Sequence, residues 1–600
     1  MAPTTPTEVV SAWLADFDQA LTKRDARRAA ELFGDECFWR DLIAFTWNIK
    51  TMEGREEIAK MLGATLANVK PSGWAIRGEA NEADGVTEGW FTFETAVGRG
   101  EGLVRLKEGK CWTLLTSLVE LKGFEEAKGA TRPKGVEHGA SHERKTWAER
   151  RAEEQAQLGT TDQPYCLIVG GGQGGIILGA RLRRLGVPTI IVEKNEKPGD
   201  SWRKRYKSLC LHDPVWYDHL PYIPFPDHWP IFSPKDKIGD WLEMYTKVME
   251  LNYWGSSEVK SAKYDEAKRE WTVEVLRGGK SMTLRPKQLV LATGMAAVPN
   301  MPKYPGMETF EGEQHHSSKH PGPDAYAGKK CVVIGSNNSA HDICAALWEV
   351  GADVTMVQRS STLVAKSDTL MELGLGPLYS EAAVKNGIDH NKADLIFASI
   401  PYKIVPRFET PLYEKIAERD AELYSRLRRA GFMLDFGEDQ SGLFMKYLRR
   451  GSGYYIDVGA SNLIADGKIK LKSGPGAVVK EIKPHSVLFA DGTELPADLI
   501  VYATGYSSMN GWAARLISQD VADKVGKCWG LGSATAKDPG PWEGELRNMW
   551  KPTRQDGLWF QGGNLHQSRH YSQYLSLQLK ARKEGIATPV YGLAEVHHKE

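Results

Sequence analysis

The sequence predicts an α/β fold in which two Rossmann-like dinucleotide-binding domains follow an N-terminal α+β cone domain. Two similar units, 166–193 and 331–359, predict the Rossmann-like domains. In each, a short apolar run leads to a small-residue turn, a helix-like segment and a second apolar run. The cone is predicted by residues 7–125, where apolar positions at helical spacing are followed by alternating, strand-like stretches.

The first unit has the residues of an FAD site. Its turn carries Gly170, Gly172 and Gly175, and Glu193 stands at the end of the next strand, followed by Lys194. Such a turn lets a pyrophosphate approach the backbone at a helix N-terminus. Because Glu193 can accept hydrogen bonds from a ribose diol and would repel a 2′-phosphate, we expect FAD here, with Lys194 assigned to the same site.

The second unit has the residues of an NADPH site. Its turn consists of Gly335, Asn337, Asn338, Ser339 and Ala340. Asn337 and Ala340 replace the second and third glycines of the pattern; asparagine tolerates positive φ, and alanine is small enough for helix–strand packing. Arg359, followed by Ser360, ends the next strand, and its guanidinium suits a 2′-phosphate. A glycine turn made only for packing is the alternative for either unit alone, but the opposite strand ends favour two nucleotide sites.

Four other segments are assigned to the cofactors. Trp202 and Arg203 follow a glycine after the first unit, where they could cover the flavin and hold its pyrophosphate. Two A-T-G turns, with Thr293 and Gly294 in one and Thr504 and Gly505 in the other, indicate where the chain passes between the nucleotide domains. The late strand–turn–helix segment 558–569 contains Asn564, and its backbone N–H groups could stabilise reduced flavin. An ordinary β–α turn is the alternative there.

The predicted domain boundaries follow from these motifs. We expect a cone domain at 1–128, a linker with a charged helix at 129–163, an FAD domain at 164–327 and 498–600, and an NADPH domain at 328–497. Residues from about 369 to about 450 fit neither Rossmann unit and are predicted to be an insertion that shapes the substrate side. In the cone, Asp41 is the one candidate acid or base, although a structural aspartate beside Arg40 is the better interpretation.

Composition excludes several classes of function. Lys plus Arg and Asp plus Glu both number 77, so the formal net charge of zero disfavours nucleic acid or a membrane surface as a partner. No apolar run reaches membrane-spanning length and residues 1–6 lack the features of a signal peptide, so we expect a cytoplasmic protein. The seven cysteines include no C-x-x-C pair, which disfavours disulfides and a dithiol relay. His315 and His316 alone do not supply a tetrahedral ligand set, so no metal is assigned.

Residues 164 to about 580 resemble the class B flavin-containing monooxygenases. Phe310, Gly312 and His316 match the family fingerprint F-x-G-x-x-x-H, although His320 stands where the family has an aromatic residue. Arg205-Tyr206 is followed by Lys207-Ser208, not by the Pro-Gly of the Baeyer–Villiger branch, which disfavours that branch. The N-terminal segment resembles the ketosteroid-isomerase/polyketide-cyclase-like (SnoaL-like) family through 38–41 and 115–120. That family includes enzymes and dimerisation or ligand-holding modules, so a homodimer through this domain is one expectation.

The resemblance implies an NADPH- and O2-dependent enzyme that forms a C4a-(hydro)peroxyflavin and oxygenates a small organic substrate, most simply at nitrogen or sulfur. His212 and His316 are then the candidate catalytic residues. The segment Leu209–Pro214 resembles L-x-L-H-x-P of the plant YUCCA-like branch, with His212 where heteroatom-oxidising members carry asparagine. Oxidative decarboxylation of an aryl pyruvate and Baeyer–Villiger oxidation are therefore alternatives. A disulfide reductase is disfavoured by the missing cysteine pair, and a non-catalytic flavoprotein scaffold is the remaining alternative.

Overall fold

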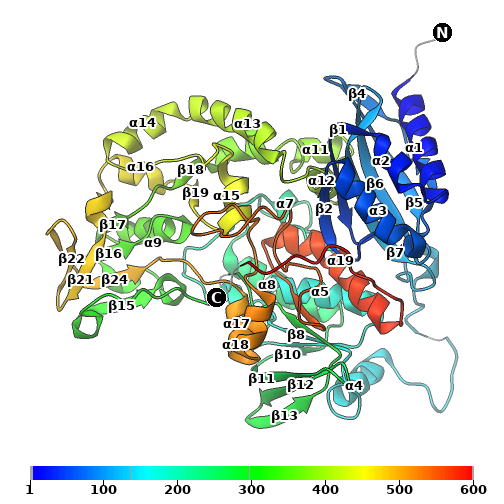
Figure 1. Ribbon diagram of the computed structural model, residues 1–600. Helices are drawn as coiled ribbons and strands as arrows, with labels where there is room; N and C mark the ends of the chain where they lie inside the picture. The colour runs from blue at the N-terminus through cyan, green and yellow to red at the C-terminus, as the bar shows by residue number, and fades with distance from the viewer. Residues whose placement is uncertain (1–4, 137, 296–297, 598–600) are drawn as a thin grey trace.

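The computed structural model describes residues 5–136, 138–295 and 298–597. The expected absence of a signal peptide rests on residues 1–6, of which residues 1–4 lie outside the described residues. The N-terminal domain packs helices against one seven-stranded sheet, in the order β2-β1-β7-β6-β5-β3 with β4 on β5 (Figure 1). Its elements are α1 (Pro6–Thr22), α2 (Ala26–Glu31), β1 (Phe33–Leu42), β2 (Ile49–Glu53), α3 (Arg55–Val69), β3 (Ser72–Ile76), β4 (Asn81–Ala83), β5 (Val86–Glu94), β6 (Gly98–Lys107) and β7 (Lys110–Leu121).

The predicted order, in which helices are followed by strands, does not hold throughout the N-terminal domain. β1 and β2 come before α3, and β1 pairs in parallel with β7. From Cys37 to Leu42 every residue of β1 is buried, so this half of the strand lacks the polar alternation by which a strand with one solvated face is recognised. Aromatic side chains, including Trp39 and Trp74, fill the space between the helices and the sheet.

The first nucleotide domain is built on a parallel sheet in the order β10-β9-β8-β14-β25. Its strands are β8 (Cys166–Val169), β9 (Thr189–Val192), β10 (Tyr253–Trp254), β14 (Gln288–Leu291) and β25 (Leu558–Phe560), with an antiparallel annex of β11 (Ser257–Asp265), β12 (Glu270–Arg277) and β13 (Lys280–Leu284). Its helices are α5 (Gln173–Arg184), α6 (Asp200–Arg203), α7 (Val215–Asp218), α8 (Lys235–Val248), α17 (Asn510–Leu516), α18 (Gln519–Val525) and α19 (Leu565–Lys583); α4 (Trp147–Gln157) and η1 (Gly129–Thr131) lie in the preceding linker segment.

The second nucleotide domain has its own parallel sheet, in the order β15-β24-β16-β17-β20. Its elements are β15 (Glu313–His316), β16 (Lys330–Ile334), α9 (Asn338–Glu349), β17 (Asp353–Gln358), β20 (Lys470–Ser473) and β24 (Leu499–Tyr502), with the hairpins β21 (Val479–Lys483), β22 (Ser486–Phe489) and β23 (Glu494–Pro496) and the short helices η2 (Met307–Thr309), η3 (Ser317–Lys319), η4 (Asp324–Tyr326) and η6 (Pro475–Ala477). The boundaries expected at 327/328 and 497/498 need correction, because β15 and β24 hydrogen-bond to each other inside this sheet and not in the first one. The second domain therefore extends at least from Glu313 to Tyr502.

The segment predicted as an insertion is mainly helical and leaves the second domain between two paired strands, β18 (Leu363–Lys366) and β19 (Tyr454–Asp457). Between them lie α10 (Ser367–Thr369), the π-helix η5 (Leu370–Leu375), α11 (Glu381–Lys385), α12 (His390–Ala398), α13 (Val405–Arg419), α14 (Ala421–Arg429) and α15 (Gly442–Arg450), and α16 (Ala460–Ala465) follows β19. In Figure 1 these helices arch from the second domain toward the N-terminal domain. The insertion thus bridges the two.

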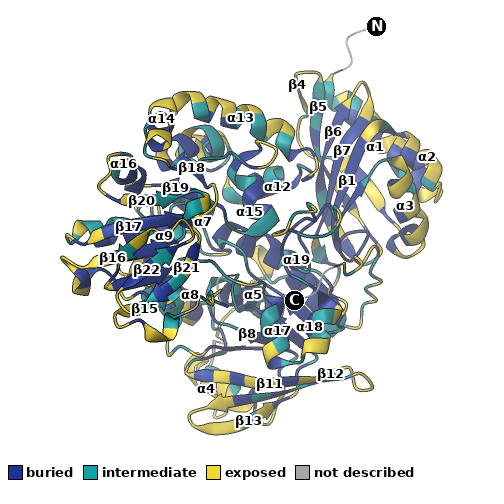
Figure 2. Cartoon of the chain, turned by 60° about the vertical axis from the view of Figure 1, so that its left-hand side comes forward, coloured by how far each residue is buried: buried dark blue, intermediate teal, exposed yellow. Residues whose placement is uncertain are grey.

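The N-terminal domain is joined to the rest of the chain by buried polar contacts. The guanidinium of Arg40 donates to both carboxylate oxygens of Glu545, at 2.7 and 2.8 Å, and to the carbonyl of Ala398 at the end of α12. Asp41 is satisfied within its own domain by the hydroxyl groups of Thr46 and Thr116. Figure 2 shows α19 as an almost wholly buried helix at the centre of the molecule. The domain is therefore part of one packed body.

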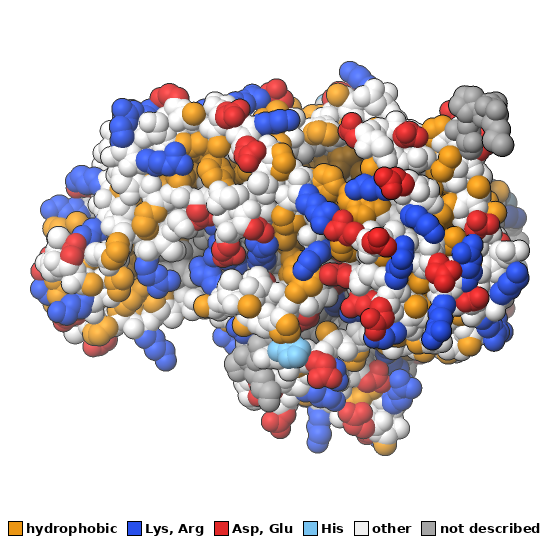
Figure 3. All heavy atoms as spheres, turned by 45° about the horizontal axis from the view of Figure 1, so that its top comes forward, with side chains coloured by type: hydrophobic (Ala, Val, Ile, Leu, Met, Phe, Trp, Pro, Cys, Tyr) orange, Lys and Arg blue, Asp and Glu red, His pale blue; other side chains and the backbone are white. Residues whose placement is uncertain are grey.

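The surface carries no extended region of one charge on the face seen in Figure 3, where acidic and basic side chains alternate. Within the described ranges, no helix is both long enough and apolar enough to cross a membrane.

Candidate functional site

The two dinucleotide turns share one packing arrangement. A Cβ added to Gly170 would lie 2.3 Å from the carbonyl oxygen of Ala292, and one added to Gly335 would lie 2.2 Å from that of Ala503. Both glycines also have positive φ, so a side chain is excluded twice. Ala292 and Ala503 begin the two A-T-G turns, which places Thr293, Gly294, Thr504 and Gly505 beside the nucleotide turns.

The helices that follow these turns both begin without a side-chain cap. Gly172 is the N-cap residue of α5 and Asn337 that of α9, and neither accepts a hydrogen bond from its helix through a side chain. A Cβ on Gly172 would have Ser201 Oγ, 3.6 Å away, as its nearest neighbour, so the backbone is open to a close approach. Uncapped N–H groups at a helix start are an anion site, and these residues fit the pyrophosphate of a dinucleotide.

The departures of the second turn from the glycine pattern are accommodated by its backbone. Asn337 has φ of −98°, so this position needs no left-handed conformation and the tolerance of asparagine for positive φ is not used. Ala340 is buried in the first turn of α9. In the first turn the corresponding Gly175 has no such freedom, since a Cβ there would lie 2.0 Å from the carbonyl oxygen of Gly170.

Glu193 lies at the turn, as the sequence predicts for a ribose ligand. Its carboxylate accepts hydrogen bonds from the backbone N–H groups of Gly171 at 2.7 Å and Asn195 at 2.8 Å. These two donors fix the carboxylate at the end of β9, next to the start of α5. The adjacent Lys194 is exposed.

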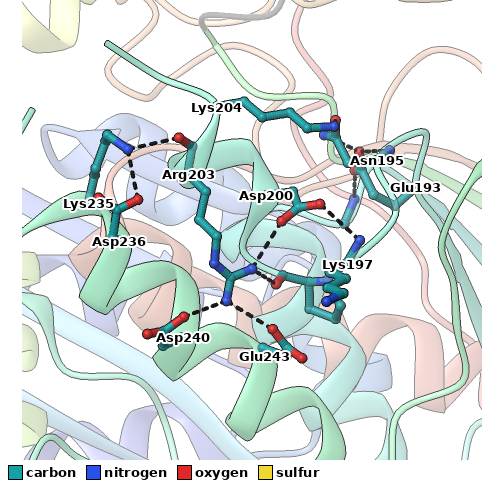
Figure 4. A network of polar contacts seen from close by, with 12 residues as sticks. Glu193, Asn195, Lys197, Asp200, Arg203, Lys204, Lys235, Asp236, Asp240 and Glu243 are labelled. Carbon is teal, nitrogen blue, oxygen red and sulfur yellow. Dashed lines mark hydrogen bonds and ion pairs between the residues drawn. The ribbon is translucent and has the colours of Figure 1, made fainter. Parts of the chain in front are cut away.

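Arg203 does not have the role predicted for it. Its guanidinium contacts Asp200 at 3.0 Å, Asp240 at 2.8 Å and Glu243 at 2.9 Å, so it is neutralised by carboxylates and joins α6 to α8 (Figure 4). A pyrophosphate would have to compete with all three. Trp202, unlike Arg203, lines the cavity described below, together with Arg205. Its indole N–H donates to Gln173 Oε1 at 3.2 Å. Arg205 is the guanidinium of this segment that reaches the site.

The strand end of the second unit is basic. Arg359 and Ser360 are exposed after β17, and Gln358 is buried, with its side chain bonded to the backbone of Met433. Lys537, in a loop distant along the chain, was not among the predicted residues. Burial, followed by the charges of Arg450 and Arg359, lowers the pKa of Lys537. An exposed guanidinium such as that of Arg359 suits a phosphate.

A cavity of about 280 Å³ lies where the first domain, the second domain and the insertion meet. Its polar lining residues include Trp202, Arg205, His212, Asp213, Asn338, Ser339, Asp342, Glu409 and Asn564. Asn564 is the N-cap of α19, accepting from the backbone of Gln567 at 2.9 Å and donating to the hydroxyl of Tyr217. The cavity therefore brings together the start of α9, the start of α19 and His212, which the sequence assigned separately.

The two histidines predicted to be catalytic differ in their surroundings. His212 lines the cavity, and its Nε2 is 3.6 Å from Asp342 Oδ2. His316 does not line it. Its Nδ1 accepts from the backbone N–H of Ser318 at 3.1 Å and its Nε2 donates to the carbonyl of Gly505 at 3.0 Å. With both ring nitrogens used inside the protein, His316 is a positioning residue that ties β15 to the second A-T-G turn.

Burial raises the pKa values of the acidic residues that line the cavity. It raises the pKa of Asp213 to about 6, that of Glu409 to about 7, and that of Asp342 in the same direction. Glu409 was not predicted as a site residue. The sequence contained one signal for it. Glu409 is charged, but the residues three and four positions later, Leu412 and Tyr413, are apolar or aromatic, which places the acid on the apolar face of a helix.

The wall of the cavity is attached to α19 by a buried ion pair. Arg569 donates to both oxygens of Asp394 on α12, at 2.8 and 2.7 Å, and these contacts hold the pKa of Asp394 far below its usual range against the opposing effect of burial. The hydroxyl of Tyr379 also donates to Asp394, at 2.9 Å. The insertion is thereby fixed to the helix whose N-terminus faces the cavity.

Metal and disulfide chemistry have no site in the described part of the chain. No group of three or more His, Cys, Asp or Glu side chains there could hold a metal ion. Within the described residues none of the seven cysteines is paired with another in a disulfide, and all except Cys210 are buried.

Comparison with known proteins gives three findings. Residues 167–406 match the family model described as pyridine nucleotide-disulphide oxidoreductase. Indole-3-pyruvate monooxygenase YUCCA1 of Oryza sativa subsp. japonica is 31% identical over 367 residues, which are 60% of this chain and 82% of that protein. Probable indole-3-pyruvate monooxygenase YUCCA4 of Arabidopsis thaliana is 30% identical over 346 residues, which are 58% of this chain and 76% of that protein.

Solved structures share the fold. The ε-caprolactone-bound cyclohexanone monooxygenase in its loose conformation aligns with a TM-score of 0.50 at 18% identity, over 70% of this chain and 88% of that one. The OTEMO complex with FAD and NADP aligns with a TM-score of 0.50 at 18% identity, over 71% of this chain and 86% of that one. The predicted pair of Rossmann-like domains is thus confirmed.

Proposed function

The chain belongs to the flavin-containing monooxygenase family, and we propose that this enzyme, with FAD and NADPH as cofactors, oxygenates a small organic substrate at nitrogen or sulfur. When bound, FAD reduced by NADPH supplies the activation of dioxygen and the transfer of one oxygen atom. The first turn, with Glu193, is assigned to FAD, and the second, with Arg359, to NADPH.

One observation carries the choice of substrate atom: the charge of the cavity lining. Three carboxylates line it, Asp213, Asp342 and Glu409, against one guanidinium, Arg205. An aryl pyruvate would bring another carboxylate into this acidic, partly apolar space, where like charges interact strongly. An amine or a thioether brings no negative charge, and its lone pair can attack oxygen directly. The lining therefore favours the heteroatom substrates.

The protein groups have four tasks in this proposal. The uncapped starts of α5 and α9 bind the phosphates, and the N-terminus of α19, beginning at Asn564, directs N–H groups toward the reacting region. His212 presents an imidazole to the cavity beside Asp342, and we assign it to hydrogen-bonding of the oxygen that is transferred. The tyrosine and leucine side chains of the insertion keep water out.

YUCCA-like decarboxylation of an aryl pyruvate is the second candidate. It is favoured by the relatives named above and by Leu209–Pro214, and Arg205 is the group that would bind the substrate carboxylate. The two candidates make opposite predictions for Arg205→Met. Loss of activity toward phenylpyruvate with unchanged thioether oxidation would indicate a carboxylate-binding arginine.

The N-terminal domain is proposed to be structural. Its similarity to the SnoaL-like family and homodimerisation through it stay predictions. The one candidate acid, Asp41, is buried and bonded to two threonines, and burial raises its pKa to about 6. Light scattering of the full chain tests the dimer.

Substrate profiling of the holoenzyme tests the proposed function. NADPH oxidation and product formation are measured with a tertiary amine, a thioether, a cyclic ketone and phenylpyruvate. We expect kcat/KM to be highest for the amine or the thioether. A higher value for phenylpyruvate or the ketone would contradict the proposal.

A further inference from the structure

Glu409 is unusual among the residues that line the cavity because it is a charged residue on the apolar face of a helix. It lies on the inner face of α13, in register with Val405, Leu412, Tyr413 and Ile416, of which Val405, Tyr413 and Ile416 are buried. A helix face of this kind normally carries apolar side chains only. Glu409 is thus an acidic residue on a helix face whose other residues are apolar or aromatic.

Among the described residues, the carboxylates of Glu409 and Asp213 have no hydrogen-bond or ion-pair partner, whereas the third carboxylate of the cavity, that of Asp342, has both. Asp342 accepts a hydrogen bond from the hydroxyl of Tyr206 at 2.7 Å and lies 3.6 Å from His212. Burial is the one cause that raises the pKa of Glu409, with no compensating charge nearby. A half-buried carboxylate without a partner is unfavourable for folding, which suggests that it serves a ligand.

Aromatic rings surround the same space. The cavity is lined by Tyr217, Phe397, Tyr413, Phe444, Tyr447 and Tyr454. The centroids of Phe397 and Phe444 are 4.6 Å apart, and those of Tyr447 and Tyr454 are 6.4 Å apart. Aromatic faces attract cations through their quadrupoles, and such cages recognise ammonium groups when a carboxylate completes them.

We propose that Glu409, with the tyrosines around it, binds a cationic nitrogen of the substrate. The proposal rests on the proposed function and specifies its substrate class: a small amphipathic molecule with an ammonium group and a separate amine or thioether to be oxidised. The two groups have to be distinct, because the oxidised atom attacks with a lone pair that a protonated nitrogen lacks. Glu409 is a specificity residue in this scheme and takes no part in oxygen transfer.

Equilibrium binding to the oxidised holoenzyme tests the proposal without requiring turnover. The probes are phenyltrimethylammonium, whose charge is independent of pH, and tert-butylbenzene, which has nearly the same shape and no charge; flavin fluorescence reports both. Glu409→Gln should weaken phenyltrimethylammonium binding about tenfold or more, as expected for loss of a charged partner, and change tert-butylbenzene binding less than about twofold. Glu414→Gln, on the exposed side of the same helix, should alter neither.

The inference would be overturned if Glu409→Gln changed the affinity for both probes equally or left the affinity for phenyltrimethylammonium unchanged. It would also be overturned if the wild-type enzyme did not bind phenyltrimethylammonium more tightly than tert-butylbenzene. Bound FAD per chain, measured for each variant, shows that the fold is intact. Thioether oxidation is measured separately: if Glu409→Gln loses cation binding while no variant and no wild-type enzyme oxidises an amine or a thioether, the proposed function fails and the Glu409 site stands.

Discussion

A buried ion pair contributes to the attachment of the N-terminal domain, and its removal gives the sharpest stability prediction. Arg40 and Glu545 have side chains that are 1% and 3% exposed, with two hydrogen bonds between them. Arg40→Met leaves the Glu545 carboxylate buried with Thr51 as its remaining side-chain donor. Breaking one side of a buried pair costs about 3–5 kcal/mol, because an uncompensated charge remains in the interior.

The assay is urea unfolding of the holoenzyme, followed by flavin release and tryptophan fluorescence. Arg407→Ala is the matched control, since Arg407 pairs with Glu36 across the same domain boundary but these side chains are 54% and 48% exposed. An exposed pair contributes about 0–1 kcal/mol. The double variant Arg40→Met/Glu545→Leu should recover much of the loss, because it removes the unpaired charge. Equal effects of Arg40→Met and Arg407→Ala would refute the reasoning.

Three further predictions concern the cofactor and substrate sites. Gly172→Val should fold, because φ is −76° and Ser201 Oγ, the nearest atom to a Cβ, is 3.6 Å away, yet its purified protein should lack FAD; a yellow protein with one flavin per chain would contradict the first-site assignment. Arg359→Ala should raise KM for NADPH about tenfold or more and leave KM for NADH nearly unchanged, since only NADPH carries the 2′-phosphate; equal effects in steady-state kinetics would remove Arg359 from that site. Phenyltrimethylammonium should bind more tightly as pH rises from about 6 to about 8, because the Glu409 carboxyl, whose pKa burial raises to about 7, gains its charge in that window. Of the other groups that face the cavity, Arg205 supplies a guanidinium, and His212 and Asp342 stand beside each other. Burial raises the pKa of the lining tyrosines, so they do not titrate in this window, and Asp213, whose pKa burial raises to about 6, gains its charge at the lower end of the window. Glu409→Gln should flatten the profile above about pH 6.5, and an unchanged profile would assign the titration to another group.

The nucleotide turns were predictable because their chemistry is local. Gly170, Gly172 and Gly175 lie within six residues, and strand, turn and helix follow one another without interruption. Short buried strands at both units gave the fold class for the same reason. The buried half of β1 escaped prediction, because strands buried on both faces have no alternation to detect.

Long-range partners decided the predictions that needed correction. Arg203 and Arg205 are two residues apart, and it is Asp240 and Glu243, on another helix, that take Arg203 away from the cofactor. The role of His316 depends on the carbonyl of Gly505, which is 189 residues away along the chain. Neither contact could be predicted from the residues that neighbour Arg203 or His316 in the sequence.

If the N-terminal domain were only an accessory module, removal of residues 1–130 would leave flavin reduction intact, and the sequence alone does not decide this. The structure places Arg40 against Glu545, and the hydroxyl of Ser117 lies 2.9 Å from that of Tyr574 on α19. Its removal would expose α19 and leave Glu545 unpaired, so we expect loss of soluble holoenzyme.

Isotope labelling tests whether the enzyme transfers one atom of dioxygen to sulfur. The enzyme is reduced with NADPH without oxygen, mixed with 18O2 in the presence of an aminoalkyl thioether, and the product is analysed by mass spectrometry. We expect a sulfoxide that contains one 18O atom, formed in proportion to the NADPH consumed. Recovery of unreacted thioether with hydrogen peroxide as the oxygen product, together with 18O-labelled phenylacetate when phenylpyruvate is supplied instead, would contradict the proposed function.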